Sequence, residues 1–454
     1  MTHRNWKTSL KRVLSRAHVL SAVRSLHYQF RRTVDRDFRN QESVREQEFR
    51  EFSSEYGAAF RHLLPEQHGL ARQVLIVSSG SLGLLVEIAL VKAFQAAGYH
   101  PVVLTDYDRW VDAFYREAGI QDLLCWDEFV RLSPDAEAVR IMADVASFEQ
   151  LLALDYGGIR VGKYAASTAL RHLRVGRLDL TNQAVRDALL PFLQRSLSYA
   201  KAAQNIVKTV RPQLVLSVDL GYSPRGELFD VCLAAGLETI TWNAAHKNNQ
   251  LMLKRYSRAN RDVHPASLSV RTWHDLQAQP WTHAERERLR RELVGSYLSG
   301  EWYGEVGTQF HTTLQEAAEI RRALDLDDRK KTAVIFSHIF WDGTFFYGTD
   351  LFGSYEEWFV ETMKVACANP HLNWIVKIHP ANIVKNVRDG VGSEPSELTA
   401  IRSLGETLPA HVRVVQPDSH MSTLSLYSVI DYCCLLYTSQ SPRDRTRYRM
   451  PSSA

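Results

Sequence analysis

Several features of membrane-spanning, secreted and metal-binding proteins are missing from this chain of 454 residues. None of its apolar runs approaches the ~20 residues that a membrane-crossing helix needs. Its N-terminus lacks the continuous apolar segment of a secretory signal peptide. Its five cysteines show no spacing typical of metal ligands, so we expect reduced thiols. The sequence therefore predicts a cytoplasmic protein without disulfides and without a metal site.

Acidic residues are absent from the first 34 positions, which carry eight lysines and arginines. Apolar residues recur with a helical period over residues 3–32, with basic residues between them. Such a helix can lie on an anionic membrane surface, here the inner face of the cell membrane. It can equally pack against its own protein or a partner, and the sequence leaves both interpretations open.

The last 21 residues have no hydrophobic period and differ from everything before them. Cys434–Ser439 and Arg449–Ala454 resemble, in this order, two translated blocks of a transposase-based sequencing adapter. The first block corresponds to TGT-CTC-TTA-TAC-ACA-TCT and the second to CGT-ATG-CCG-TCT-TCT-GCT. A disordered basic tail is the alternative. We expect residues 434–454 to be non-native, and the domain before them to be truncated near Cys433.

The overall net charge of +4 comes from the two ends of the chain. Without residues 1–34 and 434–454, the chain holds 43 basic and 50 acidic side chains. A mildly acidic body does not favour nucleic-acid binding as the main role.

Strand and helix patterns begin to alternate near residue 70. Val74–Ser78 and Leu214–Val218 have the continuous apolar character of strands that are buried on both faces. Ser79–Gly83 is a glycine turn before a helix at Leu84–Ala97, which places backbone N–H groups where an anion can bind. The turn is not the full dinucleotide-binding fingerprint, so on its own it is a weak signal.

A second alternating region starts at residue 331. Its most informative segment is Trp374–Ile378, a mostly apolar run that leads directly into His379 and Pro380. Proline ends the strand because it has no N–H group to donate to the ladder. Lys377 and His379 are therefore predicted at the carboxyl end of a central strand, where open α/β sheets bind their ligands.

These patterns predict an α/β protein with parallel sheets, built from two Rossmann-like units and a helical insert. The expected parts are a basic helix and connector (1–60), a first Rossmann-like domain (70–265), a helical connector (266–330), an incomplete second Rossmann-like domain (331–433) and the tail (434–454).

The chain resembles the bacterial capsule and surface-polysaccharide biosynthesis proteins. This family is similar, in its GT-B fold and its His-Pro motif, to the transferases of Kdo, sialic acid and glycerol phosphate. The segments that carry the resemblance are Ser79–Gly83, Asp219–Glu227, the loop after Ser337, Lys377–Asn382 and Ser422–Tyr427.

The resemblance implies a glycosyltransferase with a nucleotide-activated sugar as co-substrate, a cytidine nucleotide being one option, and no further cofactor. The donor would bind the second unit, and a glycan or lipid-linked acceptor would bind the first. Preorganised donors can stabilise the departing phosphate without a metal. The residues implied on the donor side are Lys377, His379, Asn382, Ser422 and Thr423. Those on the acceptor side are Gly80, Ser81, Gly83 and Tyr222.

A hydroxyl acceptor needs a general base within hydrogen-bond reach. The candidates are Asp219, Glu227, His338 and Asp342, with helix capping as the alternative role of the first two. Ser422 has a similar alternative as a helix N-cap. Family members continue past the Ile430–Tyr432 strand into a glycine-rich turn, a glutamate and closing helices. Without them, we expect the chain as written to be inactive and poorly folded at its C-terminal end.

Two other functions stay open from the sequence. One is a nucleotide-sugar epimerase of the same double-Rossmann shape, for which the sequence offers no clear pair of facing carboxylates. The other is a non-catalytic partner in polysaccharide assembly or export.

Overall fold

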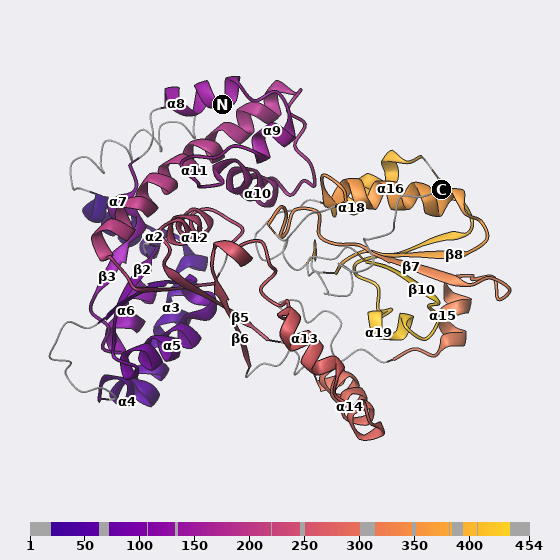
Figure 1. Ribbon diagram of the computed structural model, residues 1–454, viewed down its shortest axis with the longest axis horizontal. Coiled ribbons are helices and arrows are strands. Elements are labelled where there is room, and N and C mark those ends of the chain that lie inside the picture. Colours follow the sequence, from indigo (N-terminus) through magenta and orange to yellow (C-terminus); the bar gives the residue numbers. More distant parts are fainter. Residues whose placement is uncertain are drawn as a thin grey trace. The chain divides into compact units, whose positions relative to one another are not determined.

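The structure is a computed structural model with two β-sheets in its described part (Figure 1). It describes residues 20–62, 72–106, 108–131, 135–218, 220–245, 250–299, 314–346, 351–380, 382–383, 394–405 and 407–435. The predicted helix at 3–32 is thus described from Leu20 onward. Most of the predicted non-native tail lies outside these ranges.

The first sheet has the strand order β3-β2-β1-β4-β5-β6. Its strands are β1 (Arg72–Val77), β2 (Tyr99–Thr105), β3 (Leu123–Cys125), β4 (Leu214–Ser217), β5 (Glu238–Ala244) and β6 (Leu251–Tyr256). The pairs β1–β2, β2–β3 and β1–β4 are parallel, as expected. The chain runs outward from β1 to β3 and then returns to β4 on the other side of β1, which is the topology of a doubly wound sheet.

The strand β6 was not expected from the sequence. It pairs with β5 in antiparallel orientation, so this sheet is not purely parallel. Its residues alternate between exposed and partly buried, and two of them, Lys254 and Arg255, are charged. A strand at the edge of a sheet has this character because one side of it faces water. No long apolar run therefore marks it in the sequence.

The second sheet has the strand order β10-β7-β8-β9, and all of its strand pairs are parallel. Its strands are β7 (Thr332–Phe336), β8 (Asn373–Lys377), β9 (Val412–Val415) and β10 (Tyr432–Leu435). All five residues of β8 are buried, and the three between Asn373 and Lys377 are apolar, as expected of a strand covered on both faces. The α/β fold class with two Rossmann-like units is thereby confirmed.

Helices cover both faces of this second sheet (Figure 1). One face packs against α16 (Tyr355–Ala368) and α18 (Ser396–Ser403), with Phe359 and Ile401 in the shared core. The other face packs against α15 (Ala317–Ala323) and the short helix α19 (Thr423–Leu426). Burial on both sides leaves the ends of the strands as the accessible edges of the sheet.

Before β4 the remaining helices are α2 (Leu20–Val34), α3 (Arg36–Phe52), α4 (Ala58–His62), α5 (Leu84–Ala96), α6 (Arg109–Glu117), α7 (Trp126–Phe129), α8 (Asp135–Ala143), α9 (Phe148–Leu152), α10 (Val161–Leu173) and α11 (Gln183–Val210). After β4 they include α12 (Arg225–Ala234), α13 (Val270–Gln277) and α14 (His283–Ser299). Of these helices, α5 follows its predicted segment closely, whereas α6 and α7 were not expected from the sequence.

The chain separates into two compact units by its internal contacts. One unit comprises Met1–Glu137 and Leu197–Val218, and the other Ala138–Ser196 and Asp219–Ala454. The domain boundaries drawn from the sequence stay a prediction. Within the described ranges, no helix combines the length and the apolar character of a membrane span.

Candidate functional site

The predicted donor residues meet at the carboxyl end of β8. Lys377 ends this strand and is only 2% exposed. Its Nζ donates a hydrogen bond of 2.9 Å to the carbonyl oxygen of Met421. Burial lowers the pKa of Lys377 to about 8, and the charge of Asp418 partly opposes this shift. The ammonium group therefore holds the segment that leads into α19.

Ser422, next in the chain to Met421, is the N-cap of α19. Its Oγ accepts a hydrogen bond of 3.0 Å from the N–H of Ser425, and the residue is fully buried. Thr423 is the first residue of this helix. The structure thus shows the capping role of Ser422, while ligand binding by Ser422 and Thr423 stays a prediction.

His379 is held through its main chain. Its N–H donates to the Oγ of Ser337 at 3.0 Å, and its carbonyl oxygen accepts from Nδ2 of Asn382 at 3.3 Å. Ser337 and Asn382 are buried, whereas His379 is only partly buried. Ser337 and Asn382 therefore fix the main chain of this turn, and His379 is more exposed than either of them.

A buried carboxylate supports this turn and was missed from the sequence. Nδ2 of Asn382 donates to Oε1 of Glu397 at 2.6 Å, and Glu397 has no exposed surface. Burial raises the pKa of Glu397 to about 7, against the opposing hydrogen bonds of Asn382, Ser396 and Ser337. The only signal in the sequence is an acidic residue near the start of an otherwise ordinary helix.

The loop after β7 brings two predicted residues into direct contact. The hydroxyl of Tyr222 donates to Oδ1 of Asp342 at 2.8 Å, and it accepts from the N–H of Gly343 at 2.8 Å. The guanidinium of Arg171 lies 3.8 Å from the carboxylate of Asp342 and 4.6 Å from the ring centre of Tyr222. Asp342, a candidate base, is thus hydrogen-bonded to Tyr222, a predicted acceptor-binding residue. The side chain of Asp342 is 25% exposed.

His338 starts the same loop and packs edge-on against Tyr355, with ring centres 4.6 Å apart. Its Nδ1 lies 2.9 Å from the carbonyl oxygen of Ile339, a contact that requires the proton on Nδ1. The hydroxyl of Tyr355 donates to the carbonyl of Gly343 at 2.8 Å. These contacts fix the loop over the start of α16.

Glu227 is enclosed by the protein. Its Oε1 accepts hydrogen bonds from the hydroxyls of Ser196, at 2.6 Å, and Ser223. The residue has no exposed surface, and this burial raises its pKa to about 7. A base must reach the proton that it removes, which favours Asp342 over Glu227 on access. Asp219 lies outside the described residues.

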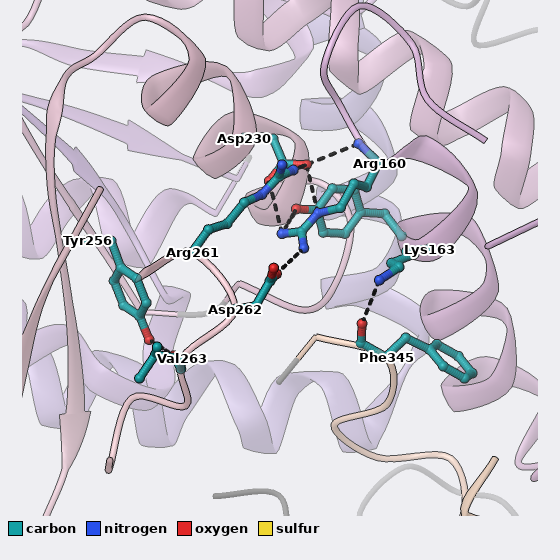
Figure 2. Close-up of polar contacts among 9 residues, drawn as sticks. Arg160, Lys163, Asp230, Tyr256, Arg261, Asp262, Val263 and Phe345 are labelled. Atoms are coloured by element: carbon teal, nitrogen blue, oxygen red, sulfur yellow. Dashed lines mark hydrogen bonds and ion pairs between the residues drawn. The ribbon is translucent and has the colours of Figure 1, made fainter. Parts of the chain in front are cut away.

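An ionic cluster ties α10 to α12 and to the segment after β6 (Figure 2). The buried carboxylate of Asp230 pairs with Arg160 at 3.2 Å and with Arg261. Figure 2 also shows Lys163 of α10 donating to the carbonyl oxygen of Phe345, at 3.1 Å. The cluster therefore fixes α10, and Lys163 links that helix to the loop that carries Asp342.

The glycine turn after β1 is satisfied internally. The N–H of Ser79 donates to Oε1 of Glu87 at 2.8 Å, and the N–H of Gly80 donates to Oγ of Ser78 at 3.2 Å. The hydroxyl of Tyr115 donates to Glu87 at 2.9 Å. Glu87, fully buried in α5, thus takes a position that an external anion could otherwise fill.

The other predicted residues of this turn give little further information. Gly83 immediately precedes α5, and Ser81 lies between it and Gly80 in a short 3₁₀ helix. Binding of an acceptor by Gly80, Ser81 and Gly83 stays a prediction. In the ranges that the structure describes, no cluster of three or more His, Cys, Asp or Glu residues could hold a metal ion.

No family model and no curated protein matches the chain. Among solved structures, the chain is similar to a UDP-GlcNAc 2-epimerase from Neisseria meningitidis bound to UDP-GlcNAc. The identity is 9% and the TM-score 0.22, over 80% of this chain and 76% of that one. It is also similar to a CDPS from Fluoribacter dumoffii, with 10% identity and a TM-score of 0.24, over 44% of this chain and 96% of that one. Neither likeness is close enough to assign a family or an activity.

Proposed function

We propose that this protein is a glycosyltransferase of capsule or surface-polysaccharide biosynthesis that uses a nucleotide-activated sugar. The observation that carries the proposal is the placement of His379 and Pro380 immediately after β8, a fully buried strand in a parallel sheet. Ligands of doubly wound sheets bind beyond the carboxyl ends of the strands. The resemblance of this motif to capsule-biosynthesis proteins supports the same assignment.

In this proposal the second sheet binds the nucleotide part of the donor. The bond between the anomeric carbon and the phosphate oxygen breaks, and the nucleotide leaves with the electron pair. His379 donates to the phosphate, where negative charge increases during departure. A donor that is already in place stabilises this charge without reorganisation. Lys377 adds positive charge near the His379 turn. Because its ammonium group donates to the carbonyl oxygen of Met421, its role is to position the segment that leads into α19.

Asp342 is the general base that the geometry favours. An acceptor hydroxyl would form its new bond to the anomeric carbon and transfer its proton to this carboxylate. The side chain is partly exposed, and Tyr222 and Arg171 hold its orientation.

The test is incubation of the protein with radiolabelled nucleotide sugars and a polysaccharide acceptor extract. In the protein with its natural sequence in place of residues 434–454, we expect transfer to the acceptor, with loss of activity in His379→Ala and in Asp342→Asn. The chain as written, which we expect to be inactive, serves as the negative control. Val44→Asp, a change at an exposed site of α3, is the matched control and should leave transfer intact. An isomerised sugar without transfer would identify an epimerase instead. Nucleotide binding without either reaction would favour a non-catalytic partner.

We also propose that α2 contacts an anionic membrane surface. Leu26, Phe30 and Val34 follow one another at helical spacing and are 70%, 63% and 60% exposed. Tyr28 lies on the other side of the helix, where its hydroxyl donates to Glu42 of α3 at 2.6 Å. The apolar stripe is therefore on the side of α2 that does not pack against α3.

Basic groups lie on the side of α2 that faces α3. A hollow of about 120 Å³ there is lined by Arg32, Arg39 and Arg109, together with Tyr28, Glu42, Ser43 and Glu46. The described residues of α2 include three arginines and no acidic residue. Apolar area combined with positive charge suits a bilayer that contains anionic lipids.

Vesicle co-sedimentation tests this contact. We expect binding to vesicles of phosphatidylglycerol and phosphatidylcholine, and weaker binding at high salt or to phosphatidylcholine alone. Phe30→Asp should reduce binding at least tenfold. Val44→Asp, which changes a residue of α3 that is 56% exposed, should not. Equal loss in both variants, or a dimer that hides the stripe, would contradict the proposal.

A further inference from the structure

The His379 turn is supported by a chain of buried polar groups from separate elements. Ser337 follows β7, Asn382 follows the turn itself, and Glu397 lies in the first turn of α18. None of these three residues is more than 5% exposed. The two main-chain groups of His379 contact Ser337 and Asn382, and Asn382 in turn contacts Glu397.

Asn382 has one side-chain amide nitrogen, and this nitrogen connects both contacts. It donates to the carbonyl oxygen of His379 at 3.3 Å and to Oε1 of Glu397 at 2.6 Å. The shorter contact with the carboxyl group fixes the orientation of the amide. Loss of this acceptor would allow the amide to rotate and would release the carbonyl of His379.

We propose that Glu397 is a positioning residue for His379, acting through Asn382. This inference rests on the proposed donor site, because it assigns a role to a residue that supports His379. Glu397 does not touch the donor in this account. A buried acid is costly unless its hydrogen bonds are made, so its place here needs a reason beyond packing. The contact with Asn382 supplies that reason, because Asn382 holds the main chain from which the His379 imidazole projects.

The alternative is that Glu397 stabilises α18 and the core without any effect on His379. Two readouts separate these roles. The first is the titration of the His379 imidazole, followed by NMR with ¹⁵N-labelled histidine and assigned by its loss in His379→Ala. The second is the affinity for CMP and UDP, measured by calorimetry.

We expect Glu397→Ala and Asn382→Ala to shift the His379 imidazole resonance and to weaken nucleotide binding at least tenfold. Glu397→Gln keeps an acceptor for Asn382 and should restore both readouts. Glu394→Gln alters a nearby exposed acid, paired with Arg402, and should change neither. In the His379→Ala background, Glu397→Ala should cause no further loss of affinity, because the two residues act through one contact.

An unchanged His379 resonance in Glu397→Ala and Asn382→Ala would overturn the inference. An additional loss of affinity in the double variant would also overturn it, because Glu397 would then act independently. Should Glu397→Ala fail to fold, Asn382→Ala together with Glu397→Gln gives the same comparison. Failure of the wild type to bind CMP or UDP would refute the proposed donor binding for these nucleotides. The NMR titration would still decide the positioning role in that case.

Discussion

The turns after β1 and β8 are built alike, but a buried glutamate contacts the main chain directly in the first turn and only through Asn382 in the second. Each follows a buried strand, and each is supported by a fully buried glutamate from a helix that follows it, Glu87 in α5 and Glu397 in α18. At β1 the carboxylate accepts directly from the N–H of Ser79. At β8 it accepts from the side chain of Asn382, which in turn contacts His379.

The two turns differ in whether the glutamate itself occupies the position where a ligand could bind. Glu87 occupies the place at the glycine turn where an anion would bind, so this turn is closed by the chain itself. Glu397 reaches its turn only through the side chain of Asn382, and His379, like Ser79 and Gly80, is partly buried. A strand, a turn and a buried acid therefore make either a structural support or a candidate binding site. Which of the two results depends on whether the acid contacts the main chain directly.

The largest effect is expected from removal of the acid that closes the first turn. Glu87→Ala leaves the N–H of Ser79 and the hydroxyl of Ser78 without their acceptor, and it leaves Tyr115 only its longer contact with Ser78. Unsatisfied buried polar groups and a cavity together should lower the free energy of unfolding by about 4 kcal/mol. Urea denaturation followed by tryptophan fluorescence measures this change. Glu87→Gln keeps an acceptor, and a loss of equal size in that variant would contradict the explanation.

A smaller effect is expected from pH at the second turn. The pKa of Glu397 is raised from its usual value near 4.5 to about 7 in the folded protein. Between these two values the folded state holds a proton that the unfolded state has released. Stability therefore falls as pH rises from 4.5 through 7, by about 3 kcal/mol for this group.

Glu397→Gln should remove this part of the pH dependence. Its urea midpoint should fall less than that of the wild type between pH 5 and pH 8. Glu227 has a similarly raised pKa and should keep contributing in both proteins. Identical pH profiles for variant and wild type would show that Glu397 does not titrate in this range.

The smallest effect is expected at the glycine turn itself. Gly80 has φ of +78°, and a Cβ added there would meet no atom within 4 Å. Gly80→Ala should therefore lower stability by about 1 kcal/mol through backbone strain alone. Because Glu87 already closes this turn, nucleotide binding should not change. A loss of nucleotide affinity in Gly80→Ala would mean that the first turn is part of the donor site.

The sequence was sufficient where local patterns determine structure. The apolar run at Trp374–Ile378 predicted a strand that is buried on both sides, and Pro380 predicted its end; the structure confirms a strand over Asn373–Lys377. The edge strand β6 was missed because its alternating, partly charged residues lack such a run. A long apolar run in a sequence indicates a strand that is buried on both faces, and the edge strand β6 is only partly buried.

The contacts of the candidate site could not be read from the sequence in the same way. Lys377 reaches the carbonyl of Met421 across 44 residues, and Tyr222 reaches Asp342 across 120. Glu87 and Glu397 look like ordinary helical acids until tertiary packing buries them. Residue types and strand ends indicated the region of the site, whereas partners distant in sequence depend on how the elements pack.

The most direct test of the account is calorimetric titration of CMP and UDP into wild type, His379→Ala and Gly80→Ala. We predict that wild type binds one of these nucleotides and that His379→Ala weakens this binding at least tenfold, about 1.4 kcal/mol. Gly80→Ala should bind as the wild type does. Nucleotide affinity that is unchanged in His379→Ala, or lost in Gly80→Ala alone, would contradict the assignment of the donor site to the carboxyl end of β8.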